Sequence, residues 1–325
     1  MRGFRSPHPT IFALQKYETM QLRASLADRP PYRKFLIIVG LTLIGAVLFT
    51  ALGTILAKIL YGIDLSGDPA LLNSEGNPSL AAAFRLFQAL AAVGTFVLPA
   101  FAAAYLFSEH EKTYLGLKVR PGAGALITVL LMLVAGIPFI NWMMQLNSGM
   151  HLPAGLKSLE DWMLATEEQA GKITRLILGG DGFGDLLINL LVIAVIPAIG
   201  EELLFRGVIQ KQFSELAQSR GAAVVLTAFL FSALHMQFFG FLPRFVLGIF
   251  LGYLYLWSGS LWLPIAAHFI NNAGAVLLSW LASRRLIALN PDTIGTEAGQ
   301  EKMLAASVFL TWMGLWLLRR QFKKT

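Results

Sequence analysis

Eight apolar runs decide what this 325-residue chain can fold into. A helix needs about 20 largely apolar residues to cross roughly 30 Å of hydrocarbon. Because a backbone inside lipid must satisfy its own hydrogen bonds, such runs predict membrane helices. We therefore predict an all-α fold, a polytopic membrane protein with about eight transmembrane helices. The runs cover residues 35–61, 80–107, 123–146, 186–209, 221–239, 244–258, 261–281 and 303–318.

Composition excludes the other broad classes of protein. Hydrophobic residues make up 56% of the chain and charged residues 14%, whereas soluble domains hold roughly 45–50% and about 25%. A chain with 23 Phe and 7 Trp also carries too much apolar surface for a disordered protein. The absence of cysteine excludes a disulfide framework, a thiolate metal site and a cysteine nucleophile.

Lysine and arginine predict the orientation. With the N-terminus inside, the inner segments hold 17 of them and the outer segments 7, and positive loops are retained in the cytoplasm. We expect both termini in the cytoplasm, with the net charge of +7 explained by topology and by contact with anionic lipid. No nucleic-acid partner is needed. The first span follows a long basic arm, which fits a retained signal anchor in a bacterial inner (plasma) membrane. The endoplasmic reticulum is the alternative.

The sequence divides into five regions along its length. Within the third, Leu156 to Ile177 have helical amphipathic spacing and acidic residues, which predicts a helix on the outer surface. A solvated loop helix is the plain interpretation, and a lid or substrate-docking segment is the other. The regions are a basic arm (1–34), a three-helix membrane region (35–146), an external amphipathic loop (147–185), a polar-residue core (186–281), and a last loop, helix and basic tail (282–325).

The fourth run contains charges that a lipid-facing helix would not tolerate. Ionisable residues inside a membrane are rare and are functional candidates by default. Glu202 and Arg206 are four residues apart, so they can pair on one helical face. Glu201 points about 100° away from Glu202 and is left to face the interior. The alternative is that the span ends at Gly200 and these residues lie in a cytoplasmic loop.

Two histidines and an asparagine add to this set. His235 lies late in the fifth run, His268 lies midway through the seventh, and Asn272 shares a helical face with His268. Asn271 is turned away from that face. A lone intramembrane histidine is more often a hydrogen-bonded structural residue, and a lone asparagine more often joins helices. Here, however, all of them fall in the same part of the chain as the two glutamates.

These residues are the ones that a water-activating hydrolase needs. In this hypothesis Glu201 and His235 take a proton from water, which attacks an amide carbonyl. His268 and Asn272 donate hydrogen bonds to the developing oxyanion. A metal version uses Glu201, His235 and His268 as a zinc ligand set with an open position, although no H-E-x-x-H motif is present.

Three short motifs carry a resemblance to a known family. E-E-x-x-x-R runs from Glu201 to Arg206, F-x-x-x-H from Phe231 to His235 and H-x-x-x-N from His268 to Asn272. In this order on three spans, they resemble the CPBP family of intramembrane proteases, which comprises type II CAAX prenyl proteases and bacteriocin-processing Abi proteins. The resemblance covers about residues 185–281.

The resemblance implies an eight-helix core with a conical intramembrane cavity that opens to the membrane and to the cytoplasmic side. It implies that Glu201 and His235 activate water and that His268 and Asn272 bind the oxyanion. Glu202 and Arg206 match the remaining motif positions, and we interpret them as supporting residues. The family has been described both as metal-independent glutamate proteases and as metalloproteases, so zinc stays open. The implied substrate is a membrane-associated peptide, prenylated or bacteriocin-like.

One conflict and two other function classes remain at this stage. If both helices are straight and complete, the predicted spans place Glu201 and His235 at opposite depths. A non-catalytic immunity or scaffold protein could retain the same motifs. A proton-coupled transporter is less favoured, because the polar residues crowd into residues 201–272 instead of repeating in both halves. The sequence does not indicate an oligomeric state.

Overall fold

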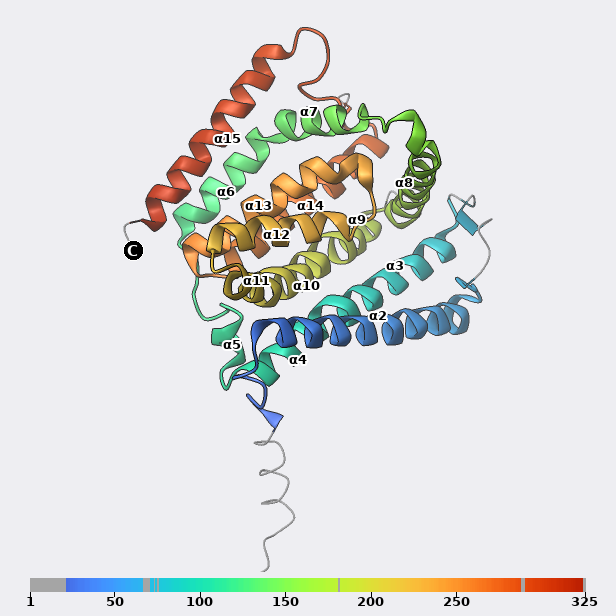
Figure 1. Cartoon of the computed structure of the whole chain (residues 1–325). Helices are drawn as coiled ribbons and strands as arrows, with labels where there is room; N and C mark the ends of the chain where they lie inside the picture. Colours follow the sequence, from blue (N-terminus) through green and yellow to red (C-terminus); the bar gives the residue numbers. More distant parts are fainter. Residues whose placement is uncertain are drawn as a thin grey trace, which may run out of the picture.

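A computed structural model describes residues 22–66, 71–72, 74, 76–180, 182–287 and 290–323. This part of the chain is helical and contains no strand, which confirms the predicted all-α class. Most of the basic arm (residues 1–21) and the last two residues of the basic tail lie outside the described residues. The helices form one bundle, and the start of α2 lies at the same end of it as the end of α15 (Figure 1).

Each of the eight predicted runs contains at least one helix. Six helices of the described chain are long and apolar enough to cross a membrane, and a pair bent by 50° makes a seventh candidate. The eighth, α12, is shorter. In chain order they are α2 (Pro31–Tyr61), α3–α4 (Pro78–Phe107), the bent pair α6 (Ala123–Ala135) and α7 (Ile137–Ser148), α9–α11 (Phe183–Ala217), α12 (Arg220–Ala233), α13 (Phe241–Ser258), α14 (Trp262–Ser283) and α15 (Glu301–Phe322).

Two predicted boundaries are wrong, and both matter for the site. The fourth span does not end at Ile209 but continues to Ala217, because the polar residues after Ile209 keep a helical conformation as α11 (Gln210–Ala217). The fifth span does not reach residue 239. α12 ends at Ala233, and a turn with Met236 at positive φ leads into a short 3₁₀ segment, η6 (Phe238–Gly240).

Two long helices contain π-helical segments that precede a proline. η2 (Val93–Val97) is followed by α4 (Leu98–Phe107) with Pro99, and η4 (Leu190–Val195) by α10 (Ile196–Leu204) with Pro197. A proline has no N–H to donate to the carbonyl four residues earlier. Single-turn π segments are a common way to absorb such a break, frequently at functional sites.

Glycines allow close contacts between these interrupted helices and their neighbours. A Cβ on Gly200 of α10 would lie 3.1 Å from the side chains of Phe96 and Val97 in η2. A Cβ on Gly45 of α2 would lie 2.0 Å from the carbonyl oxygen of Gly94. Glycine therefore lets α2 and η2 pack backbone against backbone at Gly45, and lets the side chains of η2 pack onto the backbone of α10 at Gly200. The G-x-x-x-G of α13 packs inside the bundle, since Gly248 and Gly252 face Ala228 and Val224 of α12.

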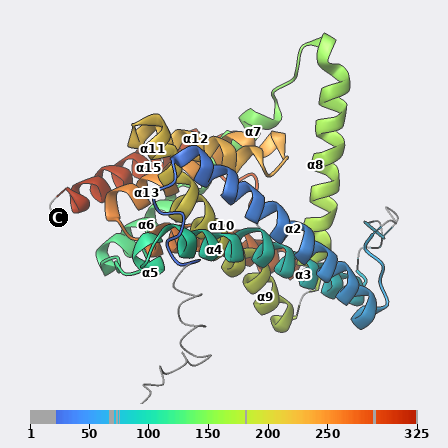
Figure 2. The ribbon, with the colours of Figure 1, turned by 60° about the horizontal axis from the view of Figure 1, so that its bottom comes forward.

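The predicted external amphipathic helix is α8 (Lys157–Leu178), which lies at one edge of the bundle (Figure 2). Buried Arg85 of α3 fixes its C-terminal end. The guanidinium donates to the carbonyl oxygens of Ile177, at 2.9 Å, and Gly179, and pairs with Asp185 at 2.9 Å. Positive charge at a helix C-terminus is favourable. This role of Arg85 depends on contacts between distant segments and could not be predicted from the sequence.

Candidate active site

The two adjacent glutamates of α10 lie in different surroundings. Glu202 and Arg206 have fully buried side chains, and Arg206 Nη1 donates to Glu202 Oε1 at 2.7 Å. This confirms the pairing predicted from their spacing. The guanidinium also donates to the Gly248 carbonyl oxygen at 3.1 Å and lies 4.7 Å from the ring centroid of Phe231. Arg206 is therefore fixed on several sides, and it holds Oε1 of Glu202 in place, while Glu202 Oε2 has no hydrogen-bond partner among the described residues.

Glu201 has no such partner. Its side chain is 11% exposed, and its buried Oε2 accepts no hydrogen bond from the described residues. The nearest cationic candidate is His268, whose Nε2 lies 3.9 Å from that oxygen. An ionised carboxylate can only accept hydrogen bonds, and a buried acceptor without a donor is costly. Glu201 is thus the carboxylate with capacity left for a water molecule or a substrate.

His268 links the two glutamates. Its Nδ1 lies 2.9 Å from Glu202 Oε1, while Nε2 faces Glu201. The chain positions of these groups are more than sixty residues apart, and the packing of α14 against α10 brings them together. An imidazole whose Nδ1–H is held by a carboxylate has a fixed ring orientation and tautomer. Glu202 therefore orients His268 toward Glu201.

His235 lies in the turn after α12, and Phe231 separates it from His268. The centroid of the Phe231 ring lies 4.9 Å from that of His235 and 6.0 Å from that of His268, with both contacts edge-on. His235 Nδ1 lies 2.7 Å from the Phe231 carbonyl oxygen. That contact requires an Nδ1–H donor, so Nε2 of a neutral ring is free to accept a proton.

The corrected boundaries remove the depth conflict. Glu201 lies 16 residues before the end of α11 at Ala217, and His235 lies 15 residues after the start of α12 at Arg220. Since the two antiparallel helices are joined by a short turn, both residues lie about 22–24 Å from it at 1.5 Å per residue. Elongation of the first helix and shortening of the second thus bring them to the same level.

Asn272 joins two helices in this conformation. Its Nδ2 donates to the Ile193 carbonyl oxygen at 3.1 Å. That carbonyl lies four residues before Pro197, which has no N–H to donate to it. The asparagine therefore satisfies a backbone group that the proline leaves without its α-helical partner. Asn271 lines a separate cavity of about 500 Å³ beside α6 and α7, yet its Nδ2 also donates to Asn272 Oδ1, at 3.1 Å.

Glu201, His235 and His268 are the ligand set of the alternative zinc hypothesis. Among the described residues, no three or more His, Asp or Glu side chains are placed to hold a metal ion. Glu201, His235 and His268 therefore do not form a ligand set in this conformation, and His268 Nδ1 is already engaged by Glu202. No chemistry is assigned to a metal here.

Two participants were not identified from sequence. Phe231 is a position of the F-x-x-x-H motif to which the sequence assigned no role, whereas its ring contacts Arg206, His235 and His268. The Ile193 carbonyl had no role at all. The proline at i+4 was the available signal for the carbonyl, but nothing in the sequence indicates which ring lies between two imidazoles.

Comparisons with known proteins agree with this site. Residues 183–274 match the family model described as "Type II CAAX prenyl endopeptidase Rce1-like", a range that contains all seven motif residues. The uncharacterized protein YpbD of Bacillus subtilis (strain 168) is 30% identical over 89 residues, which are 26% of this chain and 42% of that protein. No solved structure matches. Segment 183–274 is therefore similar to the type II CAAX prenyl endopeptidases, which supports the resemblance to the CPBP family carried by the three motifs.

Proposed function

We propose that this protein is an intramembrane endopeptidase that hydrolyses a peptide bond of a membrane-associated substrate. The family match supports a protease of the CAAX type. The observation that carries the proposal is the buried Glu201 oxygen, which has no hydrogen bond and lies 3.9 Å from an imidazole that Glu202 orients. Glu202 also has one oxygen without a hydrogen bond, but its other oxygen is held by Arg206 and His268, whereas Glu201 has no ion pair shorter than 3.9 Å.

In the proposed reaction Glu201 and His235 prepare the nucleophile. A water molecule between them gives up a proton as its oxygen attacks the carbonyl carbon of the substrate. When the tetrahedral intermediate collapses, the C–N bond breaks and the same proton passes to the leaving amine. The hydrogen bond of His235 to the Phe231 carbonyl supports this role, because it leaves Nε2 as the acceptor.

His268 and Asn272 are the proposed donors to the oxyanion, and each must have a hydrogen that is not already donated to another group. Because His268 Nδ1–H is given to Glu202, the ring can donate from Nε2 only when it carries both protons. Asn272 gives one amide hydrogen to Ile193 and can offer only the other. Glu202 and Arg206 are positioning residues, since Glu202 fixes the ring orientation of His268 and Arg206 fixes Glu202.

The first substrate class to test is a peptide held at the membrane by a prenyl group near its C-terminus, since the family description names prenyl endopeptidases. An unprenylated peptide of bacteriocin type, anchored by an apolar segment, is the second. Both present an amide bond close to the membrane surface. Comparison of the two would show whether the lipid contributes to recognition.

The test is cleavage of a fluorogenic prenylated peptide by the full-length protein in liposomes. We expect Glu201→Gln and His235→Ala each to lower kcat by about 10²–10⁴-fold, the range for loss of general acid–base catalysis. Glu168→Gln is the matched control, because Glu168 is an exposed acid of α8 that pairs with Lys172. Wild-type rates in both site variants, with folding unchanged, would overturn the proposal.

A further inference from the structure

A second pocket lies at the far end of α12 from His235. It has a volume of about 320 Å³ and opens between the end of α10–α11, the start of α12 and the end of α13. About 14 helical residues separate it from the turn that carries His235, a distance of roughly 20 Å. Its lining residues are Gln210, Lys211, Ser214, Arg220, Ala223, Tyr255, Leu256 and Gly259.

Two cations line this pocket without an ion pair. Neither Lys211 nor Arg220 forms a salt bridge with any residue that the structure describes. Lys211 Nζ lies 4.2 Å from the ring centroid of Tyr114 and 5.9 Å from that of Tyr255, which restricts its position. Glu215 is near enough to act on Lys211 electrostatically, and the three charges together leave the pocket at +1.

The pocket also contains a side chain that can bind a hydroxyl group. The Ser214 hydroxyl lines the space and can donate or accept. Gln210 lines it too, but its Nε2 donates to the Gly252 carbonyl oxygen at 3.2 Å and its Oε1 is buried inside the protein. The pocket thus combines cations suited to an oxyanion with a serine hydroxyl suited to a neighbouring hydroxyl group.

We propose that this pocket binds a phosphate group that carries a neighbouring hydroxyl, as in a glycerol phosphodiester. Lys211 and Arg220 would bind the phosphate oxygens, because guanidinium and ammonium donors form strong charge-assisted hydrogen bonds with them. The Ser214 hydroxyl would exchange a hydrogen bond with the neighbouring hydroxyl of the ligand. Basic pockets between membrane helices are typical headgroup sites, and this one lies beside the positively charged turn at the α11–α12 junction. The proposal does not depend on protease activity.

The same chemistry is available from an anionic lipid or from a soluble phosphate, so the experiment has two arms. The full-length protein is placed in nanodiscs of phosphatidylcholine with increasing phosphatidylglycerol, and separately in pure phosphatidylcholine with increasing inorganic phosphate. The readout in both is the thermal unfolding midpoint, which rises when a ligand binds the folded state. Arg220→Gln and the double variant with Lys211→Gln are compared with Arg319→Gln/Arg320→Gln, which removes two cations of α15 outside the pocket.

We expect a saturable rise with phosphatidylglycerol, with a half-saturating fraction about fivefold higher in Arg220→Gln and about 25-fold higher in the double variant, since each basic residue contributes about one such factor. The α15 control should behave as the unmodified protein does. A rise with inorganic phosphate alone that is lost in the same variants would assign the site to soluble phosphate. The proposal is wrong if neither ligand shifts the midpoint, or if both pairs of substitutions weaken the shift equally. Arg220 is exposed, so its single variant remains informative should the double variant fold poorly.

Discussion

At the scale of single residues, the molecule keeps three ionisable groups within six consecutive residues and treats them differently. Glu202 and Arg206 form a fully buried ion pair at 2.7 Å, while the nearest cationic partner of Glu201 is His268 at 3.9 Å. The sequence could predict the pair, because i to i+4 geometry is local. It could not predict that Glu202 also holds His268, because that contact depends on how α14 packs against α10.

The buried pair makes a prediction about stability. Replacement of Arg206 by Met leaves the Glu202 carboxylate buried without its main counter-charge, and we expect a loss of roughly 3–5 kcal/mol in unfolding free energy. Because Glu202→Gln removes the stranded charge, the double variant should be more stable than Arg206→Met alone. Denaturant unfolding in detergent micelles measures both. Equal losses in the single and double variants would contradict a charge-based role for Arg206.

An internal control comes from the surface of α8. Lys157 pairs with Asp161 at 3.1 Å, but both side chains are more than half exposed. Such pairs contribute about 0–1 kcal/mol. Lys157→Met should therefore change the unfolding free energy by less than about 1 kcal/mol in the same assay.

At the scale of elements, the apolar runs predicted where helices lie better than where they end. The span with Glu201 was cut short because hydropathy falls after Ile209, although α11 continues the helix on polar residues. At α12 the predicted span is too long, because apolar residues continue into the turn beyond Ala233, where the helix ends. Hydropathy reports the solvent around a residue, and the helix depends on backbone hydrogen bonds. The two coincide only in the middle of a span.

Packing of α2 against the π segment η2 predicts opposite effects of one substitution on a single helix. At Gly45 a Cβ would meet the Gly94 carbonyl oxygen at 2.0 Å, whereas at Gly40 it would meet nothing within 4 Å. Gly40→Ala should stabilise by up to about 1 kcal/mol through helix propensity. Gly45→Ala should destabilise by roughly 1–3 kcal/mol, because the backbones must separate. Thermal unfolding distinguishes them, and stabilisation by both would refute the close crossing.

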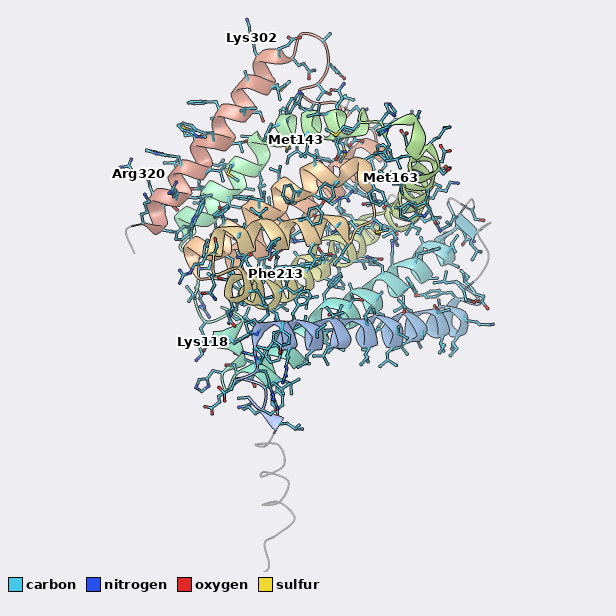
Figure 3. All side chains as sticks on the ribbon, viewed as in Figure 1. Lys118, Met143, Met163, Phe213, Lys302 and Arg320 are labelled. Atoms are coloured by element: carbon cyan, nitrogen blue, oxygen red, sulfur yellow. The ribbon has the colours of Figure 1, made fainter. Side chains whose placement is uncertain are left out.

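At the scale of the whole molecule, helix α15 finishes at the end of the bundle at which α2 begins (Figure 1). The prediction that both termini lie in the cytoplasm rests on the distribution of lysine and arginine. Exposed apolar side chains are numerous along α2 and α15, as expected for helices that face lipid. Figure 3 shows Lys302 and Arg320 at opposite ends of α15.

The absence of cysteine makes this topology simple to measure. Lys118 and Lys302 are both exposed and lie in segments predicted on opposite sides of the membrane. In intact cells we expect a membrane-impermeant maleimide to label Lys302→Cys and to label Lys118→Cys only after permeabilisation. Labelling of both, or of Lys118→Cys alone, in intact cells would contradict the predicted orientation.

Comparison of the two adjacent carboxylates tests the central claim most directly. For Glu201→Gln and Glu202→Gln, kcat in liposomes and the unfolding midpoint are measured on the same preparations. We predict that Glu201→Gln lowers kcat by about 10²–10⁴-fold while the midpoint stays near that of the unmodified protein, and that Glu202→Gln lowers the midpoint because Arg206 loses its partner. Full turnover by a folded Glu201→Gln variant would show that this carboxylate does not perform the chemistry.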